Sequence, residues 1–410
     1  MEPERKCPQC GRKIPWGQAQ CPFCPGHGGY LWSLRRDTFL LITIVFLILL
    51  FVVTGFAVRI YHDVEKGYAQ EWYTHGEDDL RAGRAEAALT DFRTALSYSH
   101  DNDQYQLRLA QALMMPGVGS AAGSEARTYL QNLLEHEPGN ATVNLELARL
   151  AARDHAVPDA LRFYHGAIYG EWTDDPVVRR RGARLELVGF LLEAGQKDSA
   201  RAELIALATD LPPDPALQTR VGTLLLQAKG YDDALKLFHQ ALLEDPNLPA
   251  ALAGSGECHF QNGDYSQAAR YLARALQQDP HLTLAAARLN AAQLVLANDP
   301  FNHRLGNMER ARRAAADFGL ALNRLQSCSA QKGVDLKSAG GDPLQTLYTQ
   351  ASALQPRAQQ QNLSRDSELL SQAMDSVFAI EQATARACGE PEGLDLALLL
   401  MAKEQGGSRP

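Results

Sequence analysis

Four cysteines near the start of the chain have a spacing that is typical of a metal site. Cys7 and Cys10 form one Cys-x-x-Cys element, and Cys21 and Cys24 form a second one shortly after it. Four thiolates are the ligand set of a closed, tetrahedral, structural zinc site. A redox pair or two disulfides are the alternatives, although a redox pair of the thioredoxin type also needs a β-α-β context that is missing here. The pattern predicts one structural Zn²⁺ ion.

Residues 1–30 resemble a bacterial zinc-ribbon module. The resemblance rests on Cys-Pro-Gln-Cys-Gly and Cys-Pro-Phe-Cys-Pro, although the spacer between them is short for that family. So few residues cannot build an apolar core, and we therefore expect folding and metal binding to be one event. His27 could replace a cysteine as a ligand, and a solvated loop residue is the alternative.

No other spacing in the chain indicates catalysis. The 11 histidines are scattered, and the Gly-x-Ser-x-Gly, Walker and dinucleotide motifs are absent from the sequence. The protein is therefore predicted not to be an enzyme. A net charge of −8 does not favour nucleic acid as a partner of the whole chain.

One sequence pattern occurs twice between residues 217 and 280. Each position recurs after a step of 34 residues (256 − 222 = 34). The pairs are Gly222 and Gly256, Leu225 and His259, Ala234 and Ala268, Phe238 and Leu272, Ala241 and Ala275, and Pro246 and Pro280. This pattern resembles the tetratricopeptide repeat, which implies pairs of antiparallel helices that bury their apolar faces by stacking. An ordinary helical bundle with accidental periodicity is the alternative.

The same phase continues toward the N terminus, so the fold class is predicted to be an all-α solenoid of helical hairpins. About six units cover residues 69–281. Residues 282–327 would form a degenerate repeat or a cap, and residues 343–404 a C-terminal helical region. Cys328 and Cys388 could form a disulfide in an oxidising compartment, and two buried thiols are the alternative.

One membrane-spanning helix is predicted at residues 37–60. The run from Phe39 to Val58 carries no charge and is long enough to cross a bilayer. It is too long, and begins too late, for a secretory signal. Tyr30 and Trp32 before the run and Tyr61 after it suit the two membrane interfaces.

The orientation of this helix follows from the positive charges on its two sides. Arg5, Lys6, Arg12, Lys13, Arg35 and Arg36 precede it, whereas Arg59 and Lys66 follow it. The excess of positive charge predicts a cytoplasmic N terminus and extracytoplasmic repeats, in the periplasm of a bacterium with this protein in its inner membrane. The opposite orientation is the alternative.

The resemblance to tetratricopeptide repeats implies a binding face along the first helix of each unit. A protein or peptide would bind on this concave face. The candidate residues are Arg149, Arg153, Arg184, Thr223, Glu257, Phe260 and Gln261. The three arginines could form a basic patch for an acidic peptide, and a solvated charged surface is the alternative.

The sequence thus predicts a membrane-anchored scaffold for protein–protein interactions, in the assembly of a cell-envelope complex. The alternative is a regulator or signal transducer that acts through the zinc ribbon, with the repeats as an extracytoplasmic sensor. Direct nucleic-acid binding by the ribbon is disfavoured, because its basic residues are few and its aromatic side chains are limited to Trp16 and Phe23.

Overall fold

The structure is a computed structural model that describes residues 5–18, 21–24, 27–119, 122–338 and 341–407. For residues 27–37 and 405–407 it describes the backbone alone. The side chains of His27, Tyr30, Trp32, Arg35 and Arg36, to which the sequence assigns roles, therefore lie outside the described part of the chain.

The described residues form α-helices and turns with no β-strand, apart from two isolated bridges. This confirms the predicted all-α fold. The chain divides into two compact units, Met1–Pro138 and Gly139–Pro410. Each unit is described by itself below.

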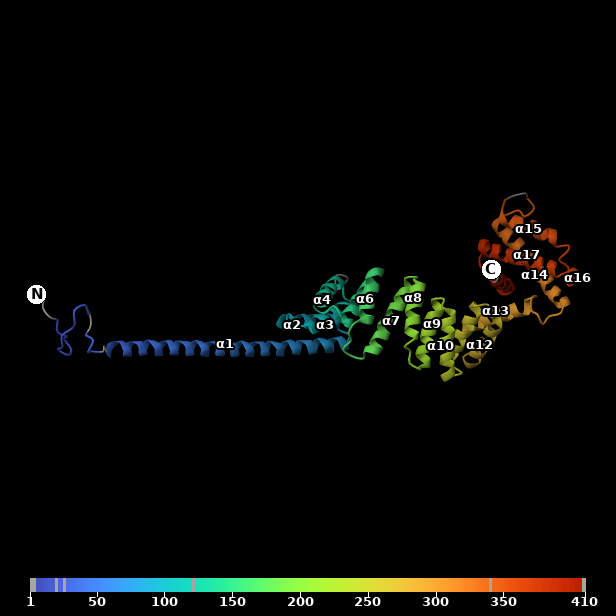
Figure 1. Ribbon diagram of the computed structural model, residues 1–410. Coiled ribbons are helices and arrows are strands. Elements are labelled where there is room, and N and C mark those ends of the chain that lie inside the picture. The colour runs from blue at the N-terminus through green and yellow to red at the C-terminus, as the bar shows by residue number, and fades with distance from the viewer. Residues whose placement is uncertain (1–4, 19–20, 25–26, 120–121, 339–340, 408–410) are drawn as a thin grey trace. The chain divides into compact units, whose positions relative to one another are not determined.

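The first unit contains one long helix and three shorter ones (Figure 1). They are α1 (His27–Arg81), α2 (Ala85–Tyr98), α3 (Asp103–Leu113) and α4 (Ala122–His136). The C-terminal part of α1 packs against α2, with Ala69 and Phe92 fully buried. A Cβ atom on Gly76 would come within 2.7 Å of the Phe92 ring, so only glycine allows these two helices to approach so closely. The apolar stretch and the first helix of the first hairpin are therefore parts of one helix.

The second unit begins with four helical hairpins. Their helices are α5 (Ala141–Arg153), α6 (Val157–Tyr169), α7 (Pro176–Glu193), α8 (Lys197–Ala208), α9 (Pro215–Gln227), α10 (Tyr231–Glu244), α11 (Pro249–Gln261) and α12 (Tyr265–Gln278). Each helix packs on the next one along the chain. A continuous apolar core runs between them from Leu145 to Cys258.

The aromatic position of the repeat shows how neighbouring hairpins fit together. Phe238 on α10 is fully buried, and its ring lies between Gly222 on α9 and Gly254 on α11. A Cβ atom would come within 2.8 Å of that ring at Gly222 and within 2.3 Å at Gly254. The small residues thus make room for one large side chain that packs against its own hairpin and the next one.

The remaining helices close the end of the hairpin array. They are α13 (Thr283–Asn298), α14 (Asn307–Lys332), α15 (Pro343–Leu354), α16 (Gln360–Leu363), α17 (Ser367–Cys388) and α18 (Gly393–Gly407). Helix α13 packs on α12 and on α18, whereas α14 packs chiefly on α17. The last helix of the chain therefore covers α13. Leu398 and Met401 on α18 are buried in the same core as Phe260 and Leu272 of the last hairpin.

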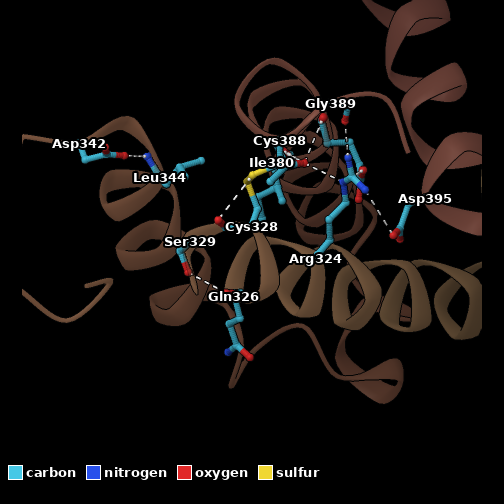
Figure 2. Close-up of a disulfide and its surroundings, with 12 residues drawn as sticks. Arg324, Gln326, Cys328, Ser329, Asp342, Leu344, Ile380, Cys388, Gly389 and Asp395 are labelled. Atoms are coloured by element: carbon cyan, nitrogen blue, oxygen red, sulfur yellow. Dashed lines mark hydrogen bonds and ion pairs between the residues drawn. A yellow bond between two sulfur atoms is a disulfide. The ribbon is translucent and has the colours of Figure 1, made fainter. Parts of the chain in front are cut away.

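A disulfide and a partly buried arginine hold this cap together (Figure 2). The disulfide joins Cys328 on α14 to Cys388 at the end of α17, with an S–S distance of 1.97 Å. One turn before Cys328, the Arg324 guanidinium donates from Nε to the Thr384 hydroxyl at 2.9 Å and from Nη2 to the Gly389 carbonyl at 3.1 Å.

Arg324 also faces two carboxylates. Its Nε lies 3.1 Å from Oε2 of the fully buried Glu381, and its Nη1 lies 3.7 Å from Oδ2 of Asp395 on α18. Burial raises the pKa of Glu381 to about 8, and the Asp395 charge adds to this effect, although Arg324 opposes it. One guanidinium thus connects α14, α17 and α18.

Candidate functional site

The first cysteine pair stands on a tight turn between two short extended segments. The Cys7 N–H donates to the Arg12 carbonyl, and the Gly11 N–H donates to the Cys7 carbonyl, both at 2.9 Å. Gly11 has a φ of +68°, a left-handed conformation that favours glycine. The second pair is turned in a similar way, because the Cys24 N–H points to the Cys21 carbonyl at 3.3 Å.

The four sulfur atoms lie close enough together to hold one metal ion. All four lie within 4.8 Å of one another, with 3.8 Å between Cys7 and Cys24 and 3.6 Å between Cys10 and Cys21. A tetrahedral ion with metal–sulfur bonds of about 2.3 Å would place its sulfur ligands roughly 3.8 Å apart. The donor set and its spacing therefore fit a metal ion held by sulfur alone.

The thiols also influence one another's ionisation. Backbone N–H groups, that of Cys10 first, lower the pKa of Cys7 to about 6. The neighbouring thiol of Cys10, together with burial, raises the pKa of Cys24 to about 12. Four thiolates at this distance repel one another unless a cation lies among them.

Outside the cysteine cluster, ion pairs join the first helices of successive hairpins. In the first unit, Arg108 on α3 lies 2.7 Å from Glu77 on α1. In the second unit, Arg149 on α5 pairs with Glu186 on α7 through two hydrogen bonds of 2.9 and 2.7 Å. Nε of Arg288 on α13 donates to Glu257 on α11 at 3.0 Å. We call the surface of the second unit that carries the Arg149–Glu186 and Arg288–Glu257 pairs the first-helix face.

The three arginines of the predicted basic patch have different surroundings. Arg149 also binds Glu146 at 3.0 Å, and the hydrogen bonds with Glu186 raise its pKa above the ordinary value for arginine. Arg184 lies only two residues before Glu186, but it approaches Glu203 on α8 at 3.3 Å instead. Arg153 is exposed at the end of α5. Arg149 is thus neutralised by acids, and Arg184 faces the second helices.

The other predicted residues partly converge at the end of the array. Gln261 donates to Glu257 Oε1 at 2.7 Å, and the Arg288 guanidinium lies 4.8 Å from the centroid of the Phe260 ring. Thr223 is exposed on α9 and donates to the Thr219 carbonyl at 2.9 Å. Arg288 and Glu186 were missed by the sequence reasoning. One signal was available, because Glu77 and Arg108 have the same separation as Glu257 and Arg288 (108 − 77 = 31 and 288 − 257 = 31).

A groove lies beside this cluster. Its volume is about 560 Å³, and its lining includes Phe260 and Arg288 from the array and Leu396, Leu400 and Lys403 from α18. The last helix of the chain therefore forms one wall of a groove on the first-helix face.

Two stretches of the chain match family models for the tetratricopeptide repeat, at residues 123–176 and 225–292. No curated protein matches the chain. Among solved structures, YrrB, described as a tetratricopeptide-repeat protein with an unusual peptide-binding site, is 17% identical, with a TM-score of 0.37 over 48% of this chain and 95% of its own.

Two further solved structures are similar over about half of the chain. PilW, described as a widely conserved type IV pilus biogenesis factor, is 18% identical, with a TM-score of 0.37 over 56% of this chain and 98% of its own. PilF of Pseudomonas aeruginosa is 15% identical, with a TM-score of 0.38 over 56% of this chain and 98% of its own.

Proposed function

We propose that this chain is anchored in a membrane and holds partners together at the cell envelope. The premise is that it carries tetratricopeptide repeats and is a scaffold for protein–protein interactions. The observation that carries this proposal is α1. Within its segment Thr38–Arg81, a stretch of 18 residues has a mean hydropathy of 3.0, and no part of this stretch is buried in the protein. Apolar side chains such as Phe46 and Phe51 are exposed there, and a lipid environment would cover them.

The orientation with the N terminus in the cytoplasm has two supports. The positive charges lie mainly before the apolar stretch. In addition, the disulfide between Cys328 and Cys388 lies on the far side of that stretch in sequence, where an oxidising periplasm would maintain it. The thiol cluster would then lie in the reducing cytoplasm, where it binds Zn²⁺ as a structural ion. This inner-membrane topology would place the repeats in the periplasm.

The partner-binding surface is proposed to be the first-helix face near Arg153, Thr223, Glu257, Phe260 and Gln261. It combines exposed polar groups with the groove beside Arg288, whose lining mixes apolar side chains such as Phe260 and Leu400 with charged ones. A peptide or protein segment suits such a surface, because apolar contacts supply affinity and charged groups fix the register. The chain would assemble an envelope complex in this way, without chemistry of its own.

Site-specific photocross-linking in intact cells tests this function. A cross-linking residue at Gln261, exposed on the first-helix face, is expected to capture a defined protein. The same residue at Arg270, exposed on the second helix α12, serves as the matched control and should not capture it. Equal capture from both positions, or none from Gln261, would contradict the proposal.

Protease treatment of spheroplasts tests the topology, because it should degrade the repeats and spare residues 5–24.

A second candidate function is that of a regulator acting through the zinc ribbon. It is favoured by the exposure of Trp16, whose side chain is 91% exposed, and of Phe23, with the Arg12 guanidinium 5.3 Å from its ring. Exposed aromatic groups on a metal-bound turn suit a macromolecular contact. Replacing Trp16 by Ala should abolish this contact without releasing the metal. A ribbon whose cellular partners are unchanged by Trp16→Ala would exclude this function.

A further inference from the structure

Another pocket lies where the last hairpin of the array meets the cap. Its volume is about 500 Å³. The turn between α11 and α12 contributes Asp264, and the turn after α13 contributes Asp299 and Phe301. Met401 and Glu404 come from α18, the last helix of the chain. We call this space the cap pocket, because it needs the cap as well as the hairpin.

The charged side chains that line the cap pocket, all of them in the described part of the chain, are carboxylates. They belong to Asp264, Asp299 and Glu404. Arg313 approaches the same turn, but its Nη1 donates to the backbone carbonyls of Leu296 and Asp299 at 3.2 and 3.1 Å. Burial, and then the charges of Asp299 and Asp264, raise the pKa of Glu404 above its ordinary value. The cap pocket therefore has a negative potential.

The three carboxylates are too far apart to hold one metal ion. Among the described residues, the cysteine cluster is the only group of three or more such ligands whose ligating atoms lie within 4.8 Å of one another. Two of the acids also hold their own turns. Oδ1 of Asp264 accepts from the Gln267 N–H at 3.0 Å, and Oδ1 of Asp299 accepts from the Phe301 N–H at 2.8 Å. A larger cation with several N–H donors suits acceptors that are spaced in this way.

A buried hydroxyl group also belongs to the cap pocket. Tyr265 is 6% exposed, lines the pocket and packs edge-on against Phe260 at 5.4 Å between ring centroids. Within the described part of the chain, its hydroxyl makes no hydrogen bond. Burial, and then the charge of Glu404, raise the pKa of Tyr265 to about 12, so the phenol is neutral and lies near this pocket-lining carboxylate. Its oxygen is able to accept a hydrogen bond from a ligand.

Aromatic rings supply the apolar part of the lining. Phe301 and Phe378 line the pocket, with 6.5 Å between their ring centroids. In the adjoining groove, the Arg288 guanidinium already lies 4.8 Å from the centroid of the Phe260 ring. A guanidinium is planar, stacks on aromatic rings and spreads five N–H donors, whereas an ammonium is compact and strongly hydrated. The lining therefore favours a guanidinium over an ammonium.

The cap pocket adjoins the groove on the first-helix face. Asn262, Gly263, Tyr265 and Glu404 line both spaces. A segment bound in the groove therefore lies within reach of the cap pocket.

We propose that the cap pocket binds an arginine side chain of the partner segment that occupies the adjoining groove. The three carboxylates neutralise the guanidinium, and the Tyr265 hydroxyl accepts a hydrogen bond from one of its N–H groups. The methylene groups of the arginine pack against the aromatic rings. This inference rests on the proposed function, in which the array binds a protein segment, and it adds which side chain that segment must carry.

Peptide selection on the full-length protein in detergent micelles tests this inference. The probe is a library of short random peptides with acetylated N termini and amidated C termini, so that side chains supply all of the charge. The wild-type protein is expected to select peptides enriched in arginine. Lysine in place of the selected arginine should weaken binding severalfold in fluorescence anisotropy titrations, because an ammonium lacks the planar group that stacks on the rings.

Charge-neutral substitutions test the acids of the pocket. Asp264→Asn and Asp299→Asn retain a side-chain oxygen that accepts the hydrogen bonds of their turns, and Glu404→Gln keeps the length of its side chain. The variant with all three changes should bind the selected peptide about tenfold more weakly or worse, because a charge-assisted hydrogen bond contributes about that much. Asp214→Asn changes the N-cap of α9, which does not line the pocket, and is the matched control that should leave binding unchanged.

The hydroxyl is tested by Tyr265→Phe. This substitution keeps the ring beside Phe260 and removes only the acceptor atom. It should weaken binding of the arginine peptide by about threefold, which is the contribution of a hydrogen bond of ordinary strength. The same substitution should leave the affinity of the lysine-containing peptide lower than that of the arginine peptide, because the rings remain.

The outcomes separate this inference from the proposed function. If the wild-type protein selects peptides without arginine enrichment, or if the triple variant selects the same sequences with the same affinity, the arginine site is wrong while binding of protein segments by the array stands. Equal enrichment of lysine and arginine would overturn the recognition of a guanidinium. If the wild-type protein selects no peptide, the arginine site is overturned, and the cross-link from Gln261 decides separately whether the array holds a partner.

Discussion

Loss of the disulfide between Cys328 and Cys388 should loosen the cap at the end of the array. The bond closes a loop over a sequence separation of 60 residues. In the chain-entropy treatment, such a cross-link lowers the entropy of the opened state by about 14 cal/mol/K, which corresponds to about 4 kcal/mol at 25 °C. The equilibrium constant for opening of α17 away from α14 should therefore rise by up to about a thousandfold in the Cys328→Ser, Cys388→Ser double variant.

Hydrogen exchange of the full-length protein measures this effect directly. Amides of α17 and α18 should exchange faster in the double variant, whereas those of α9 and α10, which pack chiefly on each other and on α11, should not change. The exchange rate should rise by less than about a thousandfold wherever Arg324 still joins α17 and α18 through Gly389 and Asp395.

The matched control is Cys258→Ala, which removes a buried thiol and leaves the disulfide intact. Its α17 amides should keep their protection, and reductant should remove that protection as it does in the wild type. Equal exchange of α17 and α18 with and without the bond would refute the reasoning, because the cap would then be held by packing and by Arg324 alone.

Three further perturbations have expected outcomes. A chelator, or Cys10→Ser, should release about one Zn²⁺ per chain and make residues 5–24 sensitive to protease while total helicity remains; retained protease resistance without metal would contradict a structural ion. Because the folded pKa of Glu381 is raised from 4.5 to about 8, its contribution to stability is complete below pH 4.5 and is lost as the pH rises toward 8. Glu381→Gln should therefore unfold at higher temperature than the wild type at pH 9 and at the same temperature at pH 4, and a constant difference across this range would exclude titration of Glu381 as the cause. Phe238→Ala should lower the free energy of unfolding of the array by about 3–5 kcal/mol in urea titrations, because it empties the space between Gly222 and Gly254; a loss below about 1 kcal/mol would show that the hairpins close around the smaller side chain.

The hairpins could be predicted from the sequence because their signal is local and repeated. The step of 34 places Phe238 and the small residues around it in the same phase, and steric fit then requires the observed packing. The cysteine cluster could also be predicted, since two Cys-x-x-Cys turns bring their thiols together over a short distance in sequence.

The cap was not predictable in the same way. Helix α18 is apolar on almost every side, from Leu396 to Ala402, so its periodicity does not indicate which face meets which partner. Its packing against α13 depends on contacts that are distant in sequence. The sequence indicated a cap or degenerate repeat and a C-terminal helical region, but not which helix faces pack together.

The binding face shows a third kind of limit. Residue type suggested that Arg149 and Arg184 share a basic surface, but the surface charge depends on which acids face them. Glu186 and Glu203 are on different helices, and each takes one of the two arginines. A prediction of free charge needs the partner across the junction as well as the helical register.

The long helix α1 has a mechanical consequence. It continues without interruption from His27 to Arg81, and its last turns are clamped against α2 by the buried Ala69 and Tyr73. A stiff rod transmits rotation about its axis, so a twist of the apolar segment turns the first hairpin through the same angle. Sliding of this rod by one residue, about 1.5 Å, would likewise shift the hairpin by that amount. Rotation or translation of the apolar segment is thus passed to the first hairpin, because one continuous helix connects them without a loop.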